Sequence, residues 1–178
     1  MTTVNESIVC AGFGGQGIMI MGKILANAAL ERGLYVTWLP SYGAEVRGGT
    51  AHSMVRVSSD AIASPMVAVM DTAIIMNTPS LDKFEKRIKP GGLVIINSSM
   101  VQRKVKRSDI EVLEAALTEE AIKLGDARVA NTIAVSIWSA KKGLFNEADI
   151  LKVIEKMAGG KENILSANIK AVKLGFKL

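Results

Sequence analysis

A glycine-rich turn near the N-terminus is the first segment of this chain that could bind an anion. The stretch CAGFGGQG occupies residues 10–17, and its glycines Gly12, Gly14 and Gly17 fit the spacing G-x-G-x-x-G. Glycines at these positions permit a tight turn and let the backbone approach a pyrophosphate at the N-terminus of the following helix. The spacing therefore raises the question whether this chain binds a dinucleotide by itself.

A dinucleotide site needs a second element, which this sequence lacks. An Asp or Glu about 20 residues after the turn, at the end of the second strand, binds the ribose hydroxyls. Here the expected second strand, residues 34–39, runs into Pro40 and Ser41, and the nearest acid is Glu45. We therefore do not expect the chain alone to bind NAD or FAD. The glycines either serve packing or contact another anionic or carbonyl group, and both remain open.

The second glycine-rich segment is SYGAEVRGG at residues 41–49. Its glycines allow backbone angles that other residues avoid, and Arg47 between them could present its planar guanidinium to a carboxylate or phosphate. Alternatively, Arg47 and Glu45 form an exposed ion pair that contributes little. We expect no catalytic residue. The candidate binding residues of the two segments are Gly12, Gly14, Gly15, Gln16, Gly17, Tyr42, Glu45, Arg47, Gly48 and Gly49.

The apolar pattern predicts the elements that position these segments. Strands are expected at residues 7–12, 34–39 (ended by Pro40), 50–57, within 66–77, at 93–97 and at 110–116. Helices are expected at residues 16–32, 79–88, 118–124, 131–143 (capped by Asn131), 147–157 and 163–174, with a turn at 89–92. The first strand, glycine turn, helix and second strand should form a βαβ unit with parallel strands.

These elements predict one α/β domain over residues 1–178. We expect three layers, α/β/α, with a mostly parallel, doubly wound sheet and a helical C-terminal third. In a parallel sheet the carboxyl ends of the strands meet at one edge, where open α/β sheets bind ligands. The glycine turn, the segment 41–49 and the polar residues at 77–80 and 97–99 should then share that edge.

Composition narrows the class of protein. Hydrophobic residues make up 49% of the 178 residues, which is ample for a core, and no stretch is apolar for as long as a membrane span requires. The N-terminus lacks the features of a signal peptide. Cys10 is the single cysteine and cannot form an internal disulfide. We therefore expect a cytoplasmic protein without a membrane partner.

Charged and metal-binding residues suggest few further functions. The net charge is +5, and its cations gather in two clusters, at residues 83–89 and 103–107. Three interpretations of these clusters are open: a nucleic-acid patch, a solvated surface, or a docking site for acidic partners. Aromatic residues form only 4% of the chain, too few to stack bases, so we expect no nucleic-acid partner. No Cys/His set has metal-ligand spacing, His52 is expected to be a core or edge residue, and Cys10 lies in a buried strand.

The two glycine-rich segments together resemble a known family. GFGGQG followed by PSYGAEVRGGTAHSMVRVS is similar to the gamma subunit of 2-oxoacid:ferredoxin (or acceptor) oxidoreductases, a module that is also a central domain of single-chain pyruvate:ferredoxin oxidoreductases. Asn131-Thr132 and LSANIKAVKLG at 165–175 resemble the closing helices of that family, so the resemblance covers essentially the whole chain. It is strongest to the 2-oxoglutarate type, and the branched-chain 2-oxoacid and indolepyruvate types remain open.

The resemblance implies a role within a larger enzyme. In that family the complex decarboxylates a 2-oxoacid on thiamine diphosphate, passes the acyl group to coenzyme A and sends electrons through iron–sulfur clusters to ferredoxin. Thiamine diphosphate and the clusters belong to the alpha, beta and delta subunits, so this chain is expected to bind no cofactor alone, with coenzyme A as the first ligand to test. Two alternatives stay open: a purely structural interaction subunit, and a stand-alone nucleotide-binding oxidoreductase.

Overall fold

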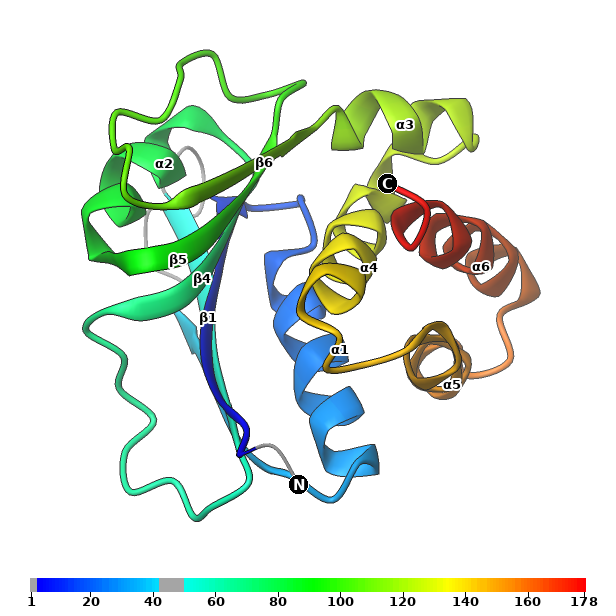
Figure 1. Ribbon diagram of the computed structural model, residues 1–178. Helices are drawn as coiled ribbons and strands as arrows, with labels where there is room; N and C mark the ends of the chain where they lie inside the picture. Colours follow the sequence, from blue (N-terminus) through cyan, green and yellow to red (C-terminus); the bar gives the residue numbers. More distant parts are fainter. Residues whose placement is uncertain (1–2, 42–49) are drawn as a thin grey trace.

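A six-stranded mixed sheet, in the order β2-β3-β1-β4-β5-β6, organises the computed structural model, which describes residues 3–41 and 50–178 (Figure 1). The strands are β1 (Asn5–Phe13), β2 (Tyr35–Ser41), β3 (Thr50–Ser58), β4 (Met70–Ile75), β5 (Ile88–Asn97) and β6 (Glu111–Ala115). The helices are α1 (Ile18–Glu31), α2 (Thr78–Phe84), η1 (Glu85–Arg87), α3 (Leu117–Lys123), η2 (Ala127–Val129), α4 (Ala130–Lys142), α5 (Glu147–Ala158) and α6 (Glu162–Gly175).

The strand pairing confirms the α/β class and corrects one expected neighbour. β1, β4, β5 and β6 pair in parallel, as expected. β3 pairs antiparallel with both β1 and β2 and therefore lies between them. The expected βαβ unit thus has its two strands pointing the same way but not hydrogen-bonded to each other.

Three local predictions were wrong. Pro40 does not end the second strand: it lies within β2 opposite Ser53, which is tolerated because β2 is an edge strand and needs no donor on its outer side. Residues 89–92 belong to β5 rather than to a free turn. Asn131 is not a helix cap, because α4 begins one residue earlier with Val129 at its N-cap. The predicted end of that helix at Gly143, where φ is 63°, is confirmed.

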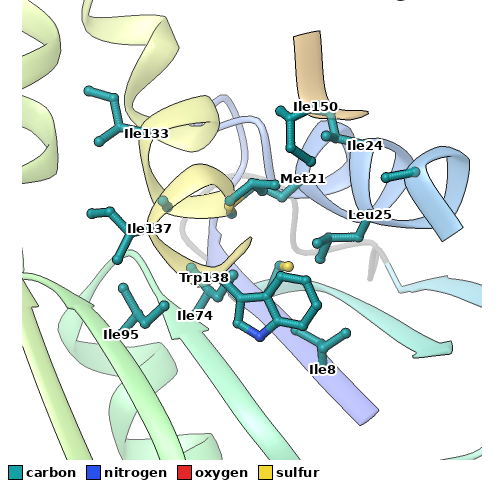
Figure 2. Packing of buried hydrophobic residues seen from close by; sticks show 14 of the residues in the cluster. Ile8, Met21, Ile24, Leu25, Ile74, Ile95, Ile133, Ile137, Trp138 and Ile150 are labelled. Atoms are coloured by element: carbon teal, nitrogen blue, oxygen red, sulfur yellow. The ribbon is translucent and has the colours of Figure 1, made fainter. Parts of the chain in front are cut away.

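The two faces of the sheet are covered unequally (Figure 1). α1 and α4 pack on one face, and α5 and α6 pack on the outer side of those two helices. The core on this side surrounds the fully buried Trp138, which packs near Met21, Leu25 and Ile74 (Figure 2). On the other face, the described residues that pack against the sheet come from α2, η1, the segment 98–110 and Val67, which precedes β4. The predicted helical C-terminal third is confirmed: α4, α5 and α6 contribute to one thick helical layer on the side of the sheet that α1 covers.

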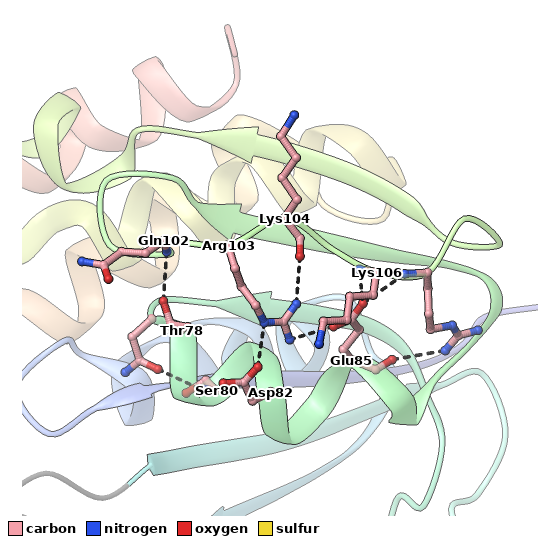
Figure 3. A network of polar contacts seen from close by, with 10 residues as sticks. Thr78, Ser80, Asp82, Glu85, Gln102, Arg103, Lys104 and Lys106 are labelled. Carbon is pink, nitrogen blue, oxygen red and sulfur yellow. Dashed lines mark hydrogen bonds and ion pairs between the residues drawn. The ribbon is translucent and has the colours of Figure 1, made fainter.

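The segment 98–110 is held in place by a buried carboxylate (Figure 3). Glu85 is 5% exposed, and its side chain accepts backbone N–H groups of Lys106 and Arg107 and pairs with the Arg103 guanidinium at 2.7 Å. Burial alone would raise the pKa of Glu85, but these donors together hold its pKa below the ordinary value. Glu85 therefore acts as an anchor that contributes to stability in its charged form.

Replacing Glu85 with glutamine is expected to lower the free energy of unfolding by about 1.5–3 kcal/mol at neutral pH, since charge-assisted hydrogen bonds are lost. A pKa lowered in the folded state gives stability that is present above the ordinary pKa of the carboxyl group and is lost as the pH falls through the folded value. The difference from wild type should therefore shrink in acid. Urea denaturation across pH checks this, with the exposed Glu155→Gln as control. A Glu85→Gln effect no larger than that of the control, or one that persists in acid, contradicts the assignment.

Among the described residues, none of the helices is both long enough and apolar enough to cross a membrane.

Candidate binding site at the carboxyl edge of the sheet

The turn between β1 and α1 is closed by the side chain of Gln16. Its Oε1 accepts a hydrogen bond from the Phe13 backbone N–H at 2.6 Å, and its Nε2 donates to the Met76 carbonyl at 3.2 Å. The Asn77 amide also donates to Gln16 Oε1, at 3.4 Å. Gln16 therefore fixes the glycine turn against the carboxyl end of β4.

The glycines of the turn divide into two kinds. A Cβ on Gly12 would lie 2.5 Å from Gln16 Oε1 and 2.9 Å from the Met76 Cβ, and a Cβ on Gly17 would overlap the Asn131 side chain of α4. These two glycines permit close packing. Gly14 and Gly15 are exposed. A Cβ added to Gly15, where φ is +94°, would have no described atom within 4 Å outside the residues next to it in the chain. Only this second pair leaves backbone accessible to a ligand.

A cavity of about 230 Å³ opens beside the exposed part of the turn. Its lining comes from the turn and from the segments that follow β4, β5 and β6: Gly15, Gln16, Met76, Met100, Thr118, Ala127, Arg128 and Ala130. α1 covers one face of the sheet and α2 the other, so the chain changes face between β1 and β4. Ligands of open α/β sheets bind at this kind of switch point.

The charge in this cavity comes from Arg128 in η2, directly before α4. Its guanidinium pairs with Asp126 at 2.8 Å, and the two side chains are 80% and 23% exposed. The hydrogen bond to Arg128 lowers the pKa of Asp126, and the same bond raises the pKa of Arg128. An ion pair this exposed contributes little to stability. The arrangement therefore leaves Arg128 free to exchange Asp126 for another anion at small cost.

Two further features lie near Arg128. The N-terminus of α1, which borders the same cavity, has neither a side-chain cap nor an acidic residue in its first turn, so the positive end of this helix dipole lacks a local counter-charge. α4 differs, because it continues directly from η2, whose N-cap is Asp126. Arg128 also lines a second cavity of about 290 Å³, whose wall is largely apolar and includes Ile154, Met157 and Ile164. Arg128 therefore lies between a cavity at the glycine turn and an apolar one.

The polar residues expected at the strand ends have structural partners. Asn77 is 1% exposed and caps α2 by accepting the Ser80 backbone N–H at 2.9 Å. Asn97 is fully buried, and its amide donates to Thr118 Oγ1 at 2.8 Å. These side chains fix helices to strand ends. The residues that line the cavity instead, Met76, Met100 and Arg128, carry no local motif, and their only sequence signal is that Met76 directly follows a strand.

Half of the candidate binding residues lie outside the part of the chain that the structure describes. These are Tyr42, Glu45, Arg47, Gly48 and Gly49. The residues that flank them are placed: Ser41 pairs with His52 at the end of β2, and Thr50 pairs with Phe13 at the start of β3. Both flanks thus lie at the sheet edge that carries the glycine turn, as the sequence predicted.

The strand order gives a physical reason for the missing ribose-binding acid. β3 separates β2 from β1, so the end of β2 lies two strand spacings, about 10 Å, from the strand that feeds the turn. In a dinucleotide fold the acid-bearing strand is the immediate neighbour of the first strand. The observed order therefore argues against a dinucleotide site of the ordinary kind.

Cys10 and His52 show no features of catalytic groups. Cys10 is fully buried, and burial raises the pKa of its thiol to about 12, which keeps it a poor nucleophile. The His52 ring packs against Phe84 with centroids 5.1 Å apart, as expected of a core or edge histidine. Within residues 3–41 and 50–178, no three His, Cys, Asp or Glu side chains are grouped so that they could hold a metal ion.

Comparison with known proteins identifies the family to which this chain is similar. A family model described as pyruvate ferredoxin/flavodoxin oxidoreductase matches residues 7–178. Ketoisovalerate oxidoreductase subunit VorA of Methanothermobacter thermautotrophicus is 35% identical over 167 residues, which cover 93% of this chain and 34% of that subunit. The chain thus spans about a third of that relative. The 2-oxoglutarate synthase subunit KorC of Methanothermobacter marburgensis is 33% identical over 148 residues, covering 79% of this chain and 80% of that subunit.

Solved structures share the fold. The gamma subunit of a keto/oxoacid ferredoxin oxidoreductase from Geobacter sulfurreducens superposes with a TM-score of 0.82 and 26% identity, covering 97% of this chain and 96% of that one. The 2-oxoglutarate:ferredoxin oxidoreductase of Magnetococcus marinus, solved with 2-oxoglutarate, coenzyme A and succinyl-CoA bound, superposes with a TM-score of 0.86 and 25% identity. The match covers 98% of this chain and 31% of that enzyme.

Proposed function

The chain belongs to the pyruvate ferredoxin/flavodoxin oxidoreductase family, and we propose that it works as the gamma subunit of a multi-subunit, thiamine-diphosphate-dependent 2-oxoacid:ferredoxin oxidoreductase. The observation that carries this proposal is the match of residues 7–178 to the family, across both the glycine turn and the segment 41–49. The complex oxidatively decarboxylates a 2-oxoacid to an acyl-CoA and CO2 and passes two electrons to ferredoxin. Thiamine diphosphate and the iron–sulfur clusters are placed in the alpha, beta and delta partners.

We propose 2-oxoglutarate as the substrate. The KorC relative is named for 2-oxoglutarate synthase, and the Magnetococcus marinus enzyme holds 2-oxoglutarate. The VorA relative is named for ketoisovalerate, so a branched-chain 2-oxoacid is the competing substrate. The described cavity does not separate these two, because substrate decarboxylation is assigned to the partner subunits.

The part proposed for this chain is to contact coenzyme A at the carboxyl edge. The exposed backbone of Gly14 and Gly15, next to the uncapped N-terminus of α1, can bind a pyrophosphate. Arg128 adds a positively charged side chain to the same cavity. Tyr42, Glu45, Arg47, Gly48 and Gly49 are proposed to complete this site from the segment that begins and ends at the same edge. A structural subunit without ligand contact is the alternative, and it is favoured by the packing roles of Gly12, Gly17 and Gln16.

Substitution of Arg47 tests the ligand role. In the reconstituted complex, Arg47→Ala should lower kcat/KM by about 10- to 100-fold, because a charge-assisted bond contributes about 1.5–3 kcal/mol. Arg47→Lys should rescue only in part, since lysine keeps the charge but loses the planar fork. Steady-state kinetics with the 2-oxoacid and coenzyme A varied separately will show which KM rises, and we expect that of coenzyme A.

The matched control is Arg32→Ala, an arginine at the opposite end of α1 that pairs with Asp149 at the surface. It should change kcat/KM by less than about twofold, as exposed substitutions do. Wild-type kinetics in Arg47→Ala, with assembly intact, would leave Arg47 without a ligand role and favour the structural subunit.

A further inference from the structure

The net charge of the chain is concentrated in one part of the fold. Residues 78–110 contain eight Lys and Arg but three Asp and Glu, an excess equal to the +5 of the whole chain, while the rest of the chain has fourteen of each sign. These residues form the strand β5, together with α2, η1 and the segment 98–110, which lie on the sheet face opposite α1 and α4. The charge is therefore displayed on one side of the molecule.

In the segment 98–110, the arginine and lysine side chains differ in how far they are exposed to solvent. Arg103, Val105 and Arg107 are half-buried, whereas Lys104 and Lys106, which alternate with them, are exposed. The arginines point inward to Glu85 and the surrounding backbone, and Figure 3 shows the Lys104 side chain directed away from Glu85. A segment that lies across the fold in this way presents its lysines on the outer surface.

The arginines and the lysines also differ in their ion pairs. Arg103 pairs with Asp82 and Glu85, and Arg107 pairs with Asp109. Lys86, Lys104 and Lys106 are all exposed and have no ion-pair partner among the described residues. We call these three residues the lysine face. No carboxylate among the described residues pairs with these three lysines, whereas the guanidinium groups of Arg103 and Arg107 beside them form internal ion pairs.

We propose that the lysine face is the docking surface for an acidic protein that associates transiently. Lysine is depleted in the cores of stable interfaces, whereas uncompensated surface charge steers an oppositely charged partner and speeds its association. This charge pattern therefore fits a brief, salt-sensitive encounter better than a permanent subunit contact. The inference does not depend on the identity of the reaction.

A nucleic acid fits this surface less well. The arginine forks that read phosphates and bases are engaged in internal pairs. The one aromatic ring in residues 78–110, that of Phe84, is fully buried beneath Lys83 and Arg87. No base can stack on a buried ring. A carboxylate-rich protein surface needs neither feature.

The test compares two triple variants of the full chain with equal charge. Lys86→Glu/Lys104→Glu/Lys106→Glu reverses the lysine face, and Lys161→Glu/Lys173→Glu/Lys177→Glu reverses three exposed lysines on and beside α6. Fluorescent poly-L-glutamate and a short DNA duplex serve as probes at ionic strengths of about 0.01 M and 0.15 M, where the Debye length is about 30 Å and 8 Å. Lys86→Gln/Lys104→Gln/Lys106→Gln removes the charge with less risk to folding.

At low ionic strength the lysine-face reversal should weaken poly-L-glutamate binding by at least about tenfold, and the α6 control by less than about threefold. The glutamine variant should fall between them, and all binding should weaken at the higher ionic strength. Equal losses in the two reversal variants would show an effect of net charge only and overturn the proposal. DNA binding that is tighter than poly-L-glutamate binding and depends on the same lysines would assign the surface to nucleic acid instead.

Discussion

Replacing Trp138 with alanine is expected to lower the free energy of unfolding by about 3–5 kcal/mol. The Trp138 indole is fully buried between the sheet and the helical layer, with the Phe145 ring 5.8 Å away. Its removal leaves a cavity that the surrounding helices cannot fill without moving α4, and large-to-alanine changes at such sites have effects of this size. Urea denaturation followed by far-UV circular dichroism measures it.

Trp138→Phe is the matched control. The indole N–H of Trp138 is buried and has no hydrogen-bond partner among the described residues, so phenylalanine removes an unsatisfied donor while keeping most of the packing. The loss should be about 1 kcal/mol, because the relief of the buried donor offsets part of the smaller cavity. A Trp138→Phe effect as large as that of Trp138→Ala would contradict this account of the core.

Gly17→Ala is expected to destabilise the chain by about 2–5 kcal/mol and so to separate packing from ligand binding in the turn. Gly17 has φ +72°, a conformation that costs an alanine about 1–2 kcal/mol. Its new Cβ would also overlap the Asn131 side chain of α4, and such overpacking costs about 1–3 kcal/mol. Equilibrium denaturation of the isolated chain measures the sum.

A double-mutant cycle isolates the contact between the turn and α4. Asn131→Ala removes the amide that the new methyl would meet, so Gly17→Ala/Asn131→Ala should regain about 1–3 kcal/mol relative to the sum of the single changes. Gly15→Ala, at φ +94° but with open space around it, should cost only about 1–2 kcal/mol. Additive effects in the cycle would mean that Gly17 is required for its backbone angle alone.

The sequence predicted the local elements well because their signals are local. An apolar run, a glycine turn and helical spacing over residues 7–32 identify β1 and α1, and Gly143 correctly ends α4. The position of β3 was not predictable in this way. Strand neighbours depend on pairing across the sheet, and β3 enters between β1 and β2 although it follows both in the chain.

The candidate site was predicted in part for the same reason. The exposed glycines belong to a recognisable motif, but Arg128 and Met100 reach the cavity from segments far along the chain. Asn131 has the residue type of a helix cap, yet its amide meets the Gly17 carbonyl at 3.5 Å across 114 residues of sequence. A capping rule considers only neighbours along the chain, so it could not reveal this contact.

The central claim, that this chain is the gamma subunit of a 2-oxoacid oxidoreductase, is tested most directly by isolating the tagged native protein with its companions. We predict that it copurifies with subunits that contain thiamine diphosphate and iron, and that this complex reduces an artificial acceptor when given 2-oxoglutarate and coenzyme A. The same chain purified alone should be inactive with every 2-oxoacid. Purification of the native protein without such companions, or turnover of a 2-oxoacid by the isolated chain, would contradict the claim.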